Sequence, residues 1–300
     1  MKIMKLRKVF MAILFSAGLI TGCKTVAENA GDTNVQNDKE VSVISTTVSA
    51  IGVLDKLDAK LIGIPITNME IPDKYKNLPQ IGQSLNPDLE IVTSLSPDLV
   101  IVDDMFKNKM EENLKAYDLN TFYFKTNTYN SFIESISSLG KEINKEKEAT
   151  DLINQLKQVE KDINKKKGSK EPTVAIMFGS GENFMLATEN SYLGDLVKTV
   201  GGKNITSNLN INSDGFGYAQ FSLEQLLKQN PDYILRFAHG DIKNTKAMFD
   251  QMFDQNPAYK ELDAVKNNKV FDLDSSIFNV SANLGVTRAI KTLGDILYGE

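Results

Sequence analysis

The chain has 300 residues, 41% of them hydrophobic, and its 34 Lys and Arg against 39 Asp and Glu give a formal net charge of −5. Four of the basic residues lie in the first eight positions, so 30 basic against 39 acidic residues remain beyond them, a charge of −9. This acidic balance argues against a nucleic-acid partner, and the single cysteine excludes a disulfide within the chain.

The N-terminus has the layout of an exported lipoprotein. Basic residues precede an apolar run from Val9 to Ile20, which is typical of a secretory signal and short for a membrane span. The run ends in Thr21-Gly22-Cys23, which resembles the bacterial lipobox, where the cysteine thiol is diacylated and the peptide is cut just before it. We therefore predict a signal peptide over residues 1–22 and lipidation of Cys23, in preference to a simple secretory signal with a free thiol.

Residues 23–40 are predicted to form a flexible tether. The segment KTVAENAGDTNVQNDKE has almost no large apolar residues and cannot bury a core. A lipid at Cys23 and this tether would hold a soluble body on the extracellular face of the cell membrane. About 260 residues remain, which is enough for two lobes of roughly 120 residues each.

The first lobe, residues 41–130, is predicted to alternate strands and helices. Short apolar and β-branched runs predict strands at Val41–Ser45, Leu61–Ile64, Leu99–Val102 and Thr121–Phe124. Helical spacing predicts helices at Thr47–Leu57, Leu89–Leu95 and Lys107–Tyr117. This alternation is typical of an α/β lobe.

Residues 131–168 are predicted to form one long, rigid helix that joins two lobes, although a helix pair fits the same pattern. The apolar positions that recur mostly at three or four are Phe132, Ile136, Leu139, Ile143, Leu152, Leu156, Val159 and Ile163. A helix of this length is unusual inside a lobe and natural between two. Gly168 and Pro172 end it.

Residues 169–300 are predicted to form a second α/β lobe that repeats features of the first. Its strands are expected near Thr173–Phe178, Asn183–Thr188, Tyr233–Phe237 and Lys269–Leu273. The segment LEIVTSLSPDLVIV begins at Leu89 and LEQLLKQNPDYILR begins at Leu223, and Asp88 and Ser222 stand at equivalent helix N-cap positions. Two similar α/β lobes joined in this way leave a ligand cleft between them.

The sequence resembles the ABC-importer substrate-binding proteins of the cobalamin, siderophore and haem class. More narrowly, it resembles the haem-receptor lipoproteins of the iron-regulated surface determinant system of Gram-positive bacteria. The segments that carry the resemblance are NLPQIGQSLNPDLE, MLATENSYLGDLVKTVGGKNI, NPDYILRFAHG and AVKNNKVFDLD. The resemblance implies haem as the transported ligand, a monomer, and an ABC permease with its ATPase and surface haem-donor proteins as partners.

In that family a histidine of the second lobe and a methionine of the first hold the haem iron. His239, the only histidine, takes the histidine's place after a predicted strand, whereas the methionine's place is taken by Leu85, which has no lone pair for a metal. Leu85 is instead expected on the apolar wall of the haem pocket. The second ligand stays open between Met69, the first candidate, Met105, and Tyr218 as a phenolate, and each of these also suits a packing role.

Two further pairs of residues are candidates by the same resemblance. Ser191 is predicted to cap a helix whose free N–H groups would receive a haem propionate, with a plain N-cap as the alternative, and Tyr192 is expected to stack on or hydrogen-bond to the ligand. Glu90 and Glu224 lie in the first turns of their helices, where the helix dipole favours an acid. In the family, the matching acids dock the two lobes onto arginines of the permease.

Rival functions are less well supported by the residues. A ferric-siderophore receptor, the nearest alternative, would favour a basic cluster, but the C-terminal half has only Arg236 and Arg288 as arginines. A zinc or manganese receptor would need several converging His, Asp or Glu ligands. No GxSxG, HExxH or P-loop pattern is present, and the histidine has no predicted carboxylate partner, so we expect a binding protein and not an enzyme.

Overall fold

The computed structural model describes residues 40–168, 171–209 and 211–299. The predicted signal peptide, Cys23 and nearly all of the predicted tether lie outside these described residues. Within them, no helix combines the length and the apolar character that crossing a bilayer requires.

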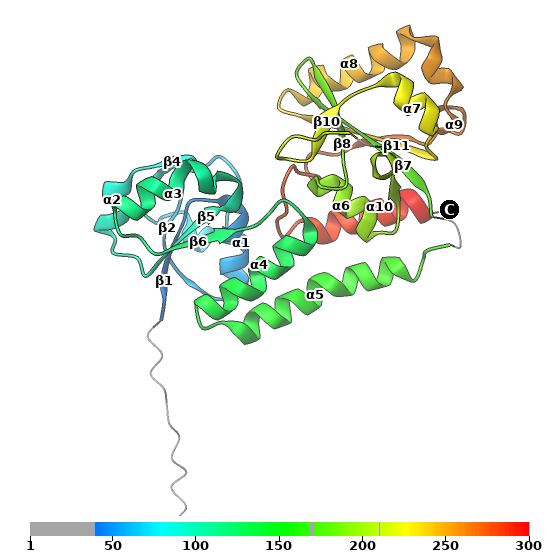
Figure 1. The fold of residues 1–300 in the computed structure, drawn as a ribbon. Helices are drawn as coiled ribbons and strands as arrows, with labels where there is room; N and C mark the ends of the chain where they lie inside the picture. Colours follow the sequence, from blue (N-terminus) through cyan, green and yellow to red (C-terminus); the bar gives the residue numbers. More distant parts are fainter. Residues whose placement is uncertain (1–39, 169–170, 210, 300) are drawn as a thin grey trace, which may run out of the picture. The chain divides into compact units, whose positions relative to one another are not determined.

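The first lobe is built on a parallel four-stranded sheet with the strand order β2-β1-β5-β6 (Figure 1). Its strands are β1 (Ser42–Ser45), β2 (Lys60–Gly63), β5 (Leu99–Asp103) and β6 (Thr121–Phe124), and a hairpin follows β2 with β3 (Gly82–Gln83) and β4 (Asn86–Pro87). Its helices are α1 (Val48–Lys56), α2 (Leu89–Ser94) and α3 (Lys107–Ala116), with short 3₁₀ turns η1 (Asp73–Tyr75) and η2 (Asp104–Phe106). β5 is buried along its whole length, as expected for a parallel strand covered on both faces. Each strand and helix predicted for this lobe is confirmed to within one residue at either end.

The second lobe contains a mixed sheet with the order β10-β8-β7-β11-β12, and β9 pairs with β7. The strands are β7 (Thr173–Ser180), β8 (Asn183–Ala187), β9 (Lys203–Asn204), β10 (Tyr218–Gln220), β11 (Tyr233–His239) and β12 (Val270–Leu273). The helices are α6 (Tyr192–Thr199), α7 (Leu223–Gln229), α8 (Ile242–Gln255), α9 (Asp263–Lys266) and α10 (Val286–Tyr298), with 3₁₀ turns η3 (Ile205–Asn208) and η4 (Pro257–Glu261). The predicted two-lobed α/β architecture is confirmed.

The prediction of one long helix over residues 131–168 is wrong, and the helix pair is correct. α4 (Tyr129–Glu142) ends where Asn144 adopts a left-handed φ of 57°, and α5 (Glu146–Asn164) starts two residues later. The N–H of Lys145 closes the end of α4 by donating to the carbonyl of Gly140 at 2.6 Å. A Cβ on Gly140 would lie 2.5 Å from the Cβ of Ala149, so the two helices pack closely where the chain reverses.

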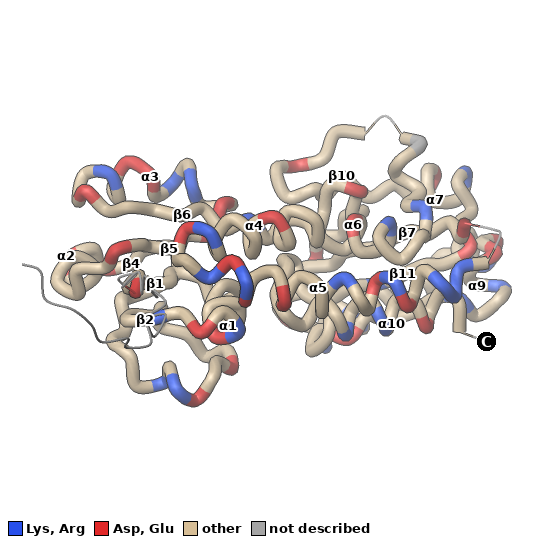
Figure 2. Tube along the Cα trace, turned by 90° about the horizontal axis from the view of Figure 1, so that it is seen from below, with Lys and Arg blue, Asp and Glu red and all other residues tan. Residues whose placement is uncertain are grey.

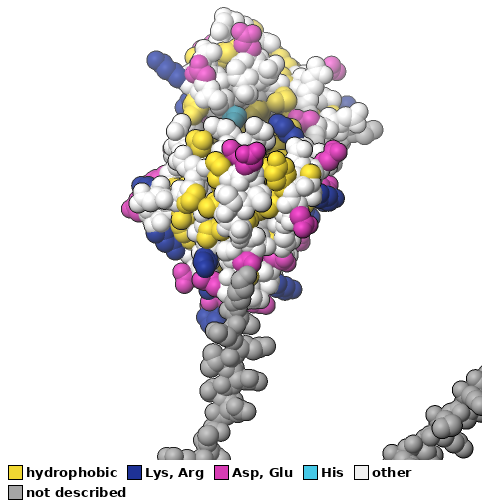
Figure 3. Space-filling model, turned by 90° about the vertical axis from the view of Figure 1, so that its left-hand side faces the viewer, with side chains coloured by type: hydrophobic (Ala, Val, Ile, Leu, Met, Phe, Trp, Pro, Cys, Tyr) yellow, Lys and Arg dark blue, Asp and Glu magenta, His cyan; other side chains and the backbone are white. Residues whose placement is uncertain are grey.

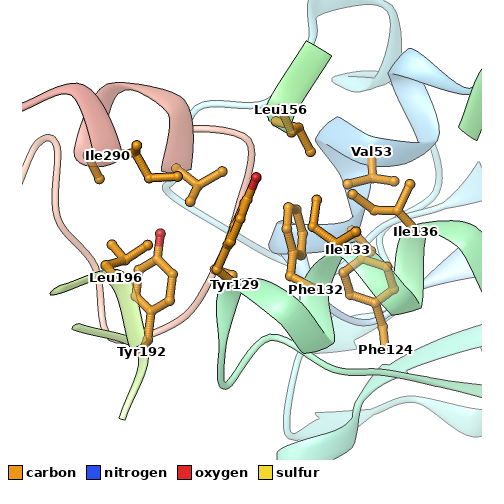
Figure 4. Close-up of a cluster of buried hydrophobic side chains, with 14 of the residues drawn as sticks. Val53, Phe124, Tyr129, Phe132, Ile133, Ile136, Leu156, Tyr192, Leu196 and Ile290 are labelled. Atoms are coloured by element: carbon orange, nitrogen blue, oxygen red, sulfur yellow. The ribbon is translucent and has the colours of Figure 1, made fainter. Parts of the chain in front are cut away.

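α5 is the helix that bridges the two lobes. It packs against α4, against α1 of the first lobe and against α10 of the second. One continuous set of buried side chains includes Val53 and Phe124 of the first lobe together with Leu196 and Ile290 of the second. Figure 4 shows aromatic side chains of α4, including Phe132, between these two groups. A large rotation of one lobe against the other would expose this shared core to water, so we expect the lobes to move little.

Two buried polar contacts also link the lobes. The N–H of Tyr129, at the start of α4, donates to the carboxylate of Asp195 on α6 at 2.7 Å. Burial is the main cause that raises the pKa of Asp195, which is only 8% exposed. The N–H of Ala282, in the segment that precedes α10, donates to the carbonyl of Thr126 at 2.7 Å. Together these contacts fix the edges of β6 and α4 against the second lobe.

Candidate ligand-binding site

His239 is the last residue of β11 and is exposed. β11 pairs in parallel with both β7 and β12, so His239 lies at the carboxyl edge of these strands, where α/β sheets commonly bind ligands. Its ring stacks on Phe178 with the centroids 6.1 Å apart and the planes at 29°. Figure 3 shows the histidine, in cyan, at the surface beside hydrophobic side chains.

A cavity of about 540 Å³, here called the aromatic cavity, adjoins Phe178 and is lined by both lobes. From the first lobe it is lined by Asp103, Asp104, Met105, Asn108, Thr126 and Asn127. From the second lobe it is lined chiefly by Phe178, Met185, Asp214, Phe216 and Tyr218. Its volume lies in the range of small-molecule sites, and its second-lobe wall is largely apolar.

Strand register explains the second-lobe wall. Phe178 on β7 lies opposite Met185 on β8, and Tyr218 on β10 lies opposite Ala187 on β8. The rings of Phe178 and Tyr218 are 4.4 Å apart between centroids. His239, Phe178, Met185 and Tyr218 therefore follow one another across four neighbouring strands on the same face of the sheet.

A second cavity of about 470 Å³, here called the polar cavity, also has walls from both lobes. Its first-lobe wall includes Val48 and Ser49 at the start of α1, together with Met69 and Glu70, and its second-lobe wall includes Ser275, Ser276, Asn283 and Arg288. Phe237 on β11 pairs with Leu273 on β12. His239 follows Phe237 by two residues and Ser275 follows Leu273 by two residues, so both come at the same end of these two strands. The polar cavity therefore lies on the β12 side of His239 and the aromatic cavity on its β7 side.

The first-lobe walls come from the carboxyl ends of its parallel strands. Asp103 ends β5, is 7% exposed, and accepts hydrogen bonds from the hydroxyl of Thr126 at 2.9 Å and the N–H of Met105 at 3.1 Å. Burial is the main cause that raises the pKa of Asp103. On the side of the polar cavity, α1 follows β1 directly, and no side chain caps its first N–H groups.

The structure places the candidate methionines in different cavities. Met105 is 38% exposed and lines the aromatic cavity, whereas Met69 is 59% exposed and lines the polar cavity. Each therefore lies on the first-lobe side of one of the two cavities, and His239 itself is in the lining of neither. Tyr218 is 7% exposed, and burial raises the pKa of its hydroxyl, which opposes the phenolate form. Its hydroxyl has no hydrogen-bond partner among the described residues.

Three residues expected at the haem pocket lie elsewhere. Leu85 is in the β3–β4 hairpin and lines a separate cavity of about 90 Å³ against α3. Ser191 is fully buried and acts as a plain N-cap, because its hydroxyl accepts from the N–H of Gly194 at 3.0 Å and donates to the carbonyl of Thr188 at 2.7 Å. Tyr192 is 3% exposed and packs near Tyr129 in the shared core (Figure 4). Ser191 and Tyr192 are taken up by local packing and Leu85 is 40% exposed, and all three are absent from the linings of both cavities.

The two paired acids occupy equivalent exposed positions. Asp88 caps α2 by accepting from the N–H of Glu90 at 3.0 Å, and Ser222 caps α7 by accepting from the N–H of Gln225 at 3.3 Å. Both predicted N-caps are therefore confirmed. Glu90 and Glu224 are exposed, and neither forms an ion pair with another described residue.

The Arg236 side chain is directed away from both cavities. It alternates with His239 along β11 and so faces α8, where it pairs with Asp272 at 2.7 Å and with Asp250 at 2.8 Å.

Figure 2 shows basic and acidic positions interspersed along the helices, α5 included. In the described part of the chain, no group of three or more His, Cys, Asp or Glu side chains could hold a metal ion.

The sequence did not point to Phe178, Phe216, Asp214 or Arg288 as site residues. Asp214 builds a tight turn by accepting the N–H groups of Phe216 at 2.9 Å and Tyr218 at 2.8 Å, and this turn presents Phe216 with 51% of its surface exposed. The available signal was the run SDGFGY, in which glycines flank an aromatic residue after a turn-forming Asp.

Comparison with known proteins gives a consistent picture. Residues 43–277 match the sequence profile of the family described as periplasmic binding protein. The chain is 32% identical over 299 residues to the high-affinity heme uptake system protein IsdE of Staphylococcus aureus strain MRSA252, and the match covers 99% of each chain.

Solved structures share the fold. The crystal structure of S. aureus IsdE complexed with heme superposes with a TM-score of 0.73 at 35% identity, over 86% of this chain and 99% of that one. An ABC transporter substrate-binding protein from Listeria monocytogenes EGD-e superposes with a TM-score of 0.77 at 34% identity, over 87% of this chain and 100% of that one. S. aureus SirA complexed with staphyloferrin B superposes with a TM-score of 0.70 at 23% identity, over 87% of this chain and 94% of that one. At this identity the similarity shows the fold alone.

Proposed function

Because the chain belongs to the periplasmic binding protein family, we propose that it is the haem-binding component of an ABC importer. In this role it receives haem from surface haem-donor proteins and delivers it, as a monomer, to an ABC permease driven by an ATPase. The family is one of binding components of transporters, so the protein is not an enzyme. Haem is its cargo and not a resident cofactor.

The observation that carries the proposal is the position of His239. An imidazole nitrogen is a common axial ligand of haem iron. This imidazole is exposed at the end of β11, between β7, which carries Phe178 of the aromatic cavity, and β12, which leads to Ser275 of the polar cavity. Haem extends on every side of its iron, so a ring bound at His239 would enter both cavities. Apolar and aromatic walls suit the macrocycle in the aromatic cavity, and polar side chains suit the exit of the propionates in the polar cavity.

The siderophore alternative finds less support in the residues. Anionic ferric siderophores favour clusters of basic side chains, but Arg288 is the one cationic residue among those that line the two cavities. Arg236 is held by Asp250 and Asp272 on the opposite face of the sheet. The similarity to SirA, at 23% identity, does not extend to its ligand.

The proposal includes attachment and docking. Lipidation of Cys23 would anchor the protein on the extracellular face of a Gram-positive cell membrane. Glu90 and Glu224 are exposed at equivalent helix starts and form no ion pair within the described residues, and they would dock the two lobes onto basic residues of the permease. The full-length similarity to a protein named for heme uptake supports a transporter as the partner.

Haemin titration of the apo protein tests the function and identifies the second axial ligand. We expect a saturable, sharp Soret band for the wild type. Of Met69→Leu and Met105→Leu, which conserve side-chain volume, one should convert the spectrum to a high-spin form and weaken binding about 10-fold, because the thioether ligand is lost. The other variant then serves as the matched control.

Two outcomes would count against parts of this proposal. A haemin spectrum with the wild-type protein that equals that of free haemin would contradict haem as the ligand. Wild-type spectra for both methionine variants would exclude methionine as the sixth ligand while leaving His239 in place.

A further inference from the structure

The aromatic cavity has an acidic wall, defined here as Asp103, Asp104 and Asp214. Asp103 and Asp104 come from the first lobe and Asp214 from the second, so carboxylates border the cavity from both sides. No Lys or Arg is among the residues that line it. Lys107, which follows the 3₁₀ turn that contains Asp104, has its ammonium 4.8 Å from the centroid of the Tyr123 ring.

The three carboxylates differ in how far hydrogen bonds and burial reduce the negative charge that they present to the cavity. Asp103 is 7% exposed and is hydrogen-bonded by Thr126 and Met105, and its burial favours the neutral form. Asp214 is exposed and accepts two N–H groups of its own turn. The carboxylate of Asp104 forms no hydrogen bond or ion pair with other described residues, although its backbone carbonyl accepts the N–H of Lys107. Asp104 and Asp214 therefore carry most of the negative field that a ligand would meet in this cavity.

The polar cavity differs in charge. It contains Arg288 together with Glu70, several uncharged polar side chains, and apolar ones such as Ile71 and Leu284. The field of Arg288 also acts on Asp274, whose pKa is lowered mainly by hydrogen bonds from Ser276. A carboxylate on the ligand therefore meets one cation and one acid at the polar cavity, and three acids with no cation at the aromatic cavity. The two ends of the site are not interchangeable for a charged ligand.

We propose, on the basis of the haem function above, that the acidic wall selects iron porphyrins by where their carboxylates lie. Haem carries its two propionates on one edge, so its opposite, uncharged edge can enter the aromatic cavity. An iron porphyrin with carboxylates on opposite edges, such as the tetracarboxylate iron coproporphyrin, must place at least one carboxylate against Asp104 or Asp214. Repulsion between this carboxylate and the Asp carboxylates, with little water between them, then disfavours binding of the tetracarboxylate porphyrin.

Parallel titrations with haemin and with iron coproporphyrin test this selectivity. The wild type should bind iron coproporphyrin at least about 10-fold more weakly than haemin. The double variant Asp104→Asn and Asp214→Asn keeps side-chain size and the acceptor oxygen of the Asp214 turn. It should reduce the ratio of the haemin affinity to the iron coproporphyrin affinity at least about 3-fold, and the wild-type ratio should fall as salt is raised. The matched control, Asp118→Asn with Asp254→Asn, removes two exposed charges that line neither cavity and should keep the wild-type ratio.

The outcomes separate this inference from the function on which it rests. Equal, His239-dependent binding of both porphyrins by the wild type would overturn the selectivity and leave the haem function intact. An unchanged ratio in the Asp104→Asn, Asp214→Asn variant would overturn the role of the acidic wall. Failure of the wild type to bind haemin at all would overturn both.

Discussion

Replacement of His239 by alanine is expected to remove the sharp Soret band of the haem-loaded protein and to weaken haemin binding at least about 100-fold. Loss of a residue that merely supports a metal ligand costs 10- to 100-fold in affinity as a rule, so loss of the ligand itself should cost at least that much. The change should barely affect stability, within about 1 kcal/mol, because the ring is exposed and makes no hydrogen bond with the described residues. Absorption titration and thermal melting of the same samples separate the two effects.

Ser180 provides the matched control for this variant. It lies directly opposite His239 in the β7–β11 pairing, at the same edge of the sheet. Ser180→Ala should therefore keep the wild-type spectrum and affinity, since the small hydroxyl makes no hydrogen bond with the described residues. Identical spectra for wild type and His239→Ala would show that the iron ligand has been assigned wrongly.

Replacement of Gly217 by alanine is expected to cost about 3 kcal/mol or more in the free energy of unfolding. Gly217 has a φ of +82°, and a Cβ there would lie 2.3 Å from the backbone nitrogen of Ser191. Its carbonyl also accepts both the N–H and the hydroxyl of Thr188, each at 2.8 Å. The strain therefore falls on the backbone that carries Phe216 and Tyr218 into the aromatic cavity. Denaturant unfolding followed by circular dichroism measures the loss.

Gly215 is the matched control, two residues earlier in the same turn. A Cβ at Gly215 would meet nothing within 4 Å, and its φ is not in the left-handed region. Gly215→Ala should change stability by less than about 0.5 kcal/mol. A Gly217→Ala protein that unfolds at the same denaturant concentration as Gly215→Ala would show that the close approach to Ser191 is not as tight as described.

The secondary structure of the first lobe could be predicted from sequence because each strand is a short apolar run between turn residues. Leu99 to Val102 is such a run, and it forms the fully buried β5. The joining helix was mispredicted because its apolar spacing was treated as continuous across the eight residues between Ile143 and Leu152. Asn144, which tolerates the left-handed conformation, was the local signal of the break.

The candidate site was only partly predictable. His239 could be placed at the cleft edge because it follows a predicted strand of the parallel sheet. The walls around it could not, because they form where loops of two lobes meet, and no local pattern fixes that meeting. Leu85 and Tyr192 show the limit: both were expected at the ligand, but Leu85 is exposed beside α3 and Tyr192 is buried in the shared core.

The position of the iron in crystals of the haem complex, located by its anomalous scattering, tests the central claim most directly. We predict an iron within bonding distance of an imidazole nitrogen of His239, in the space between the aromatic and polar cavities, with the thioether of Met69 or Met105 on its other side. An iron on an outer surface, or one held by other residues while His239 stays free, would contradict the proposed site.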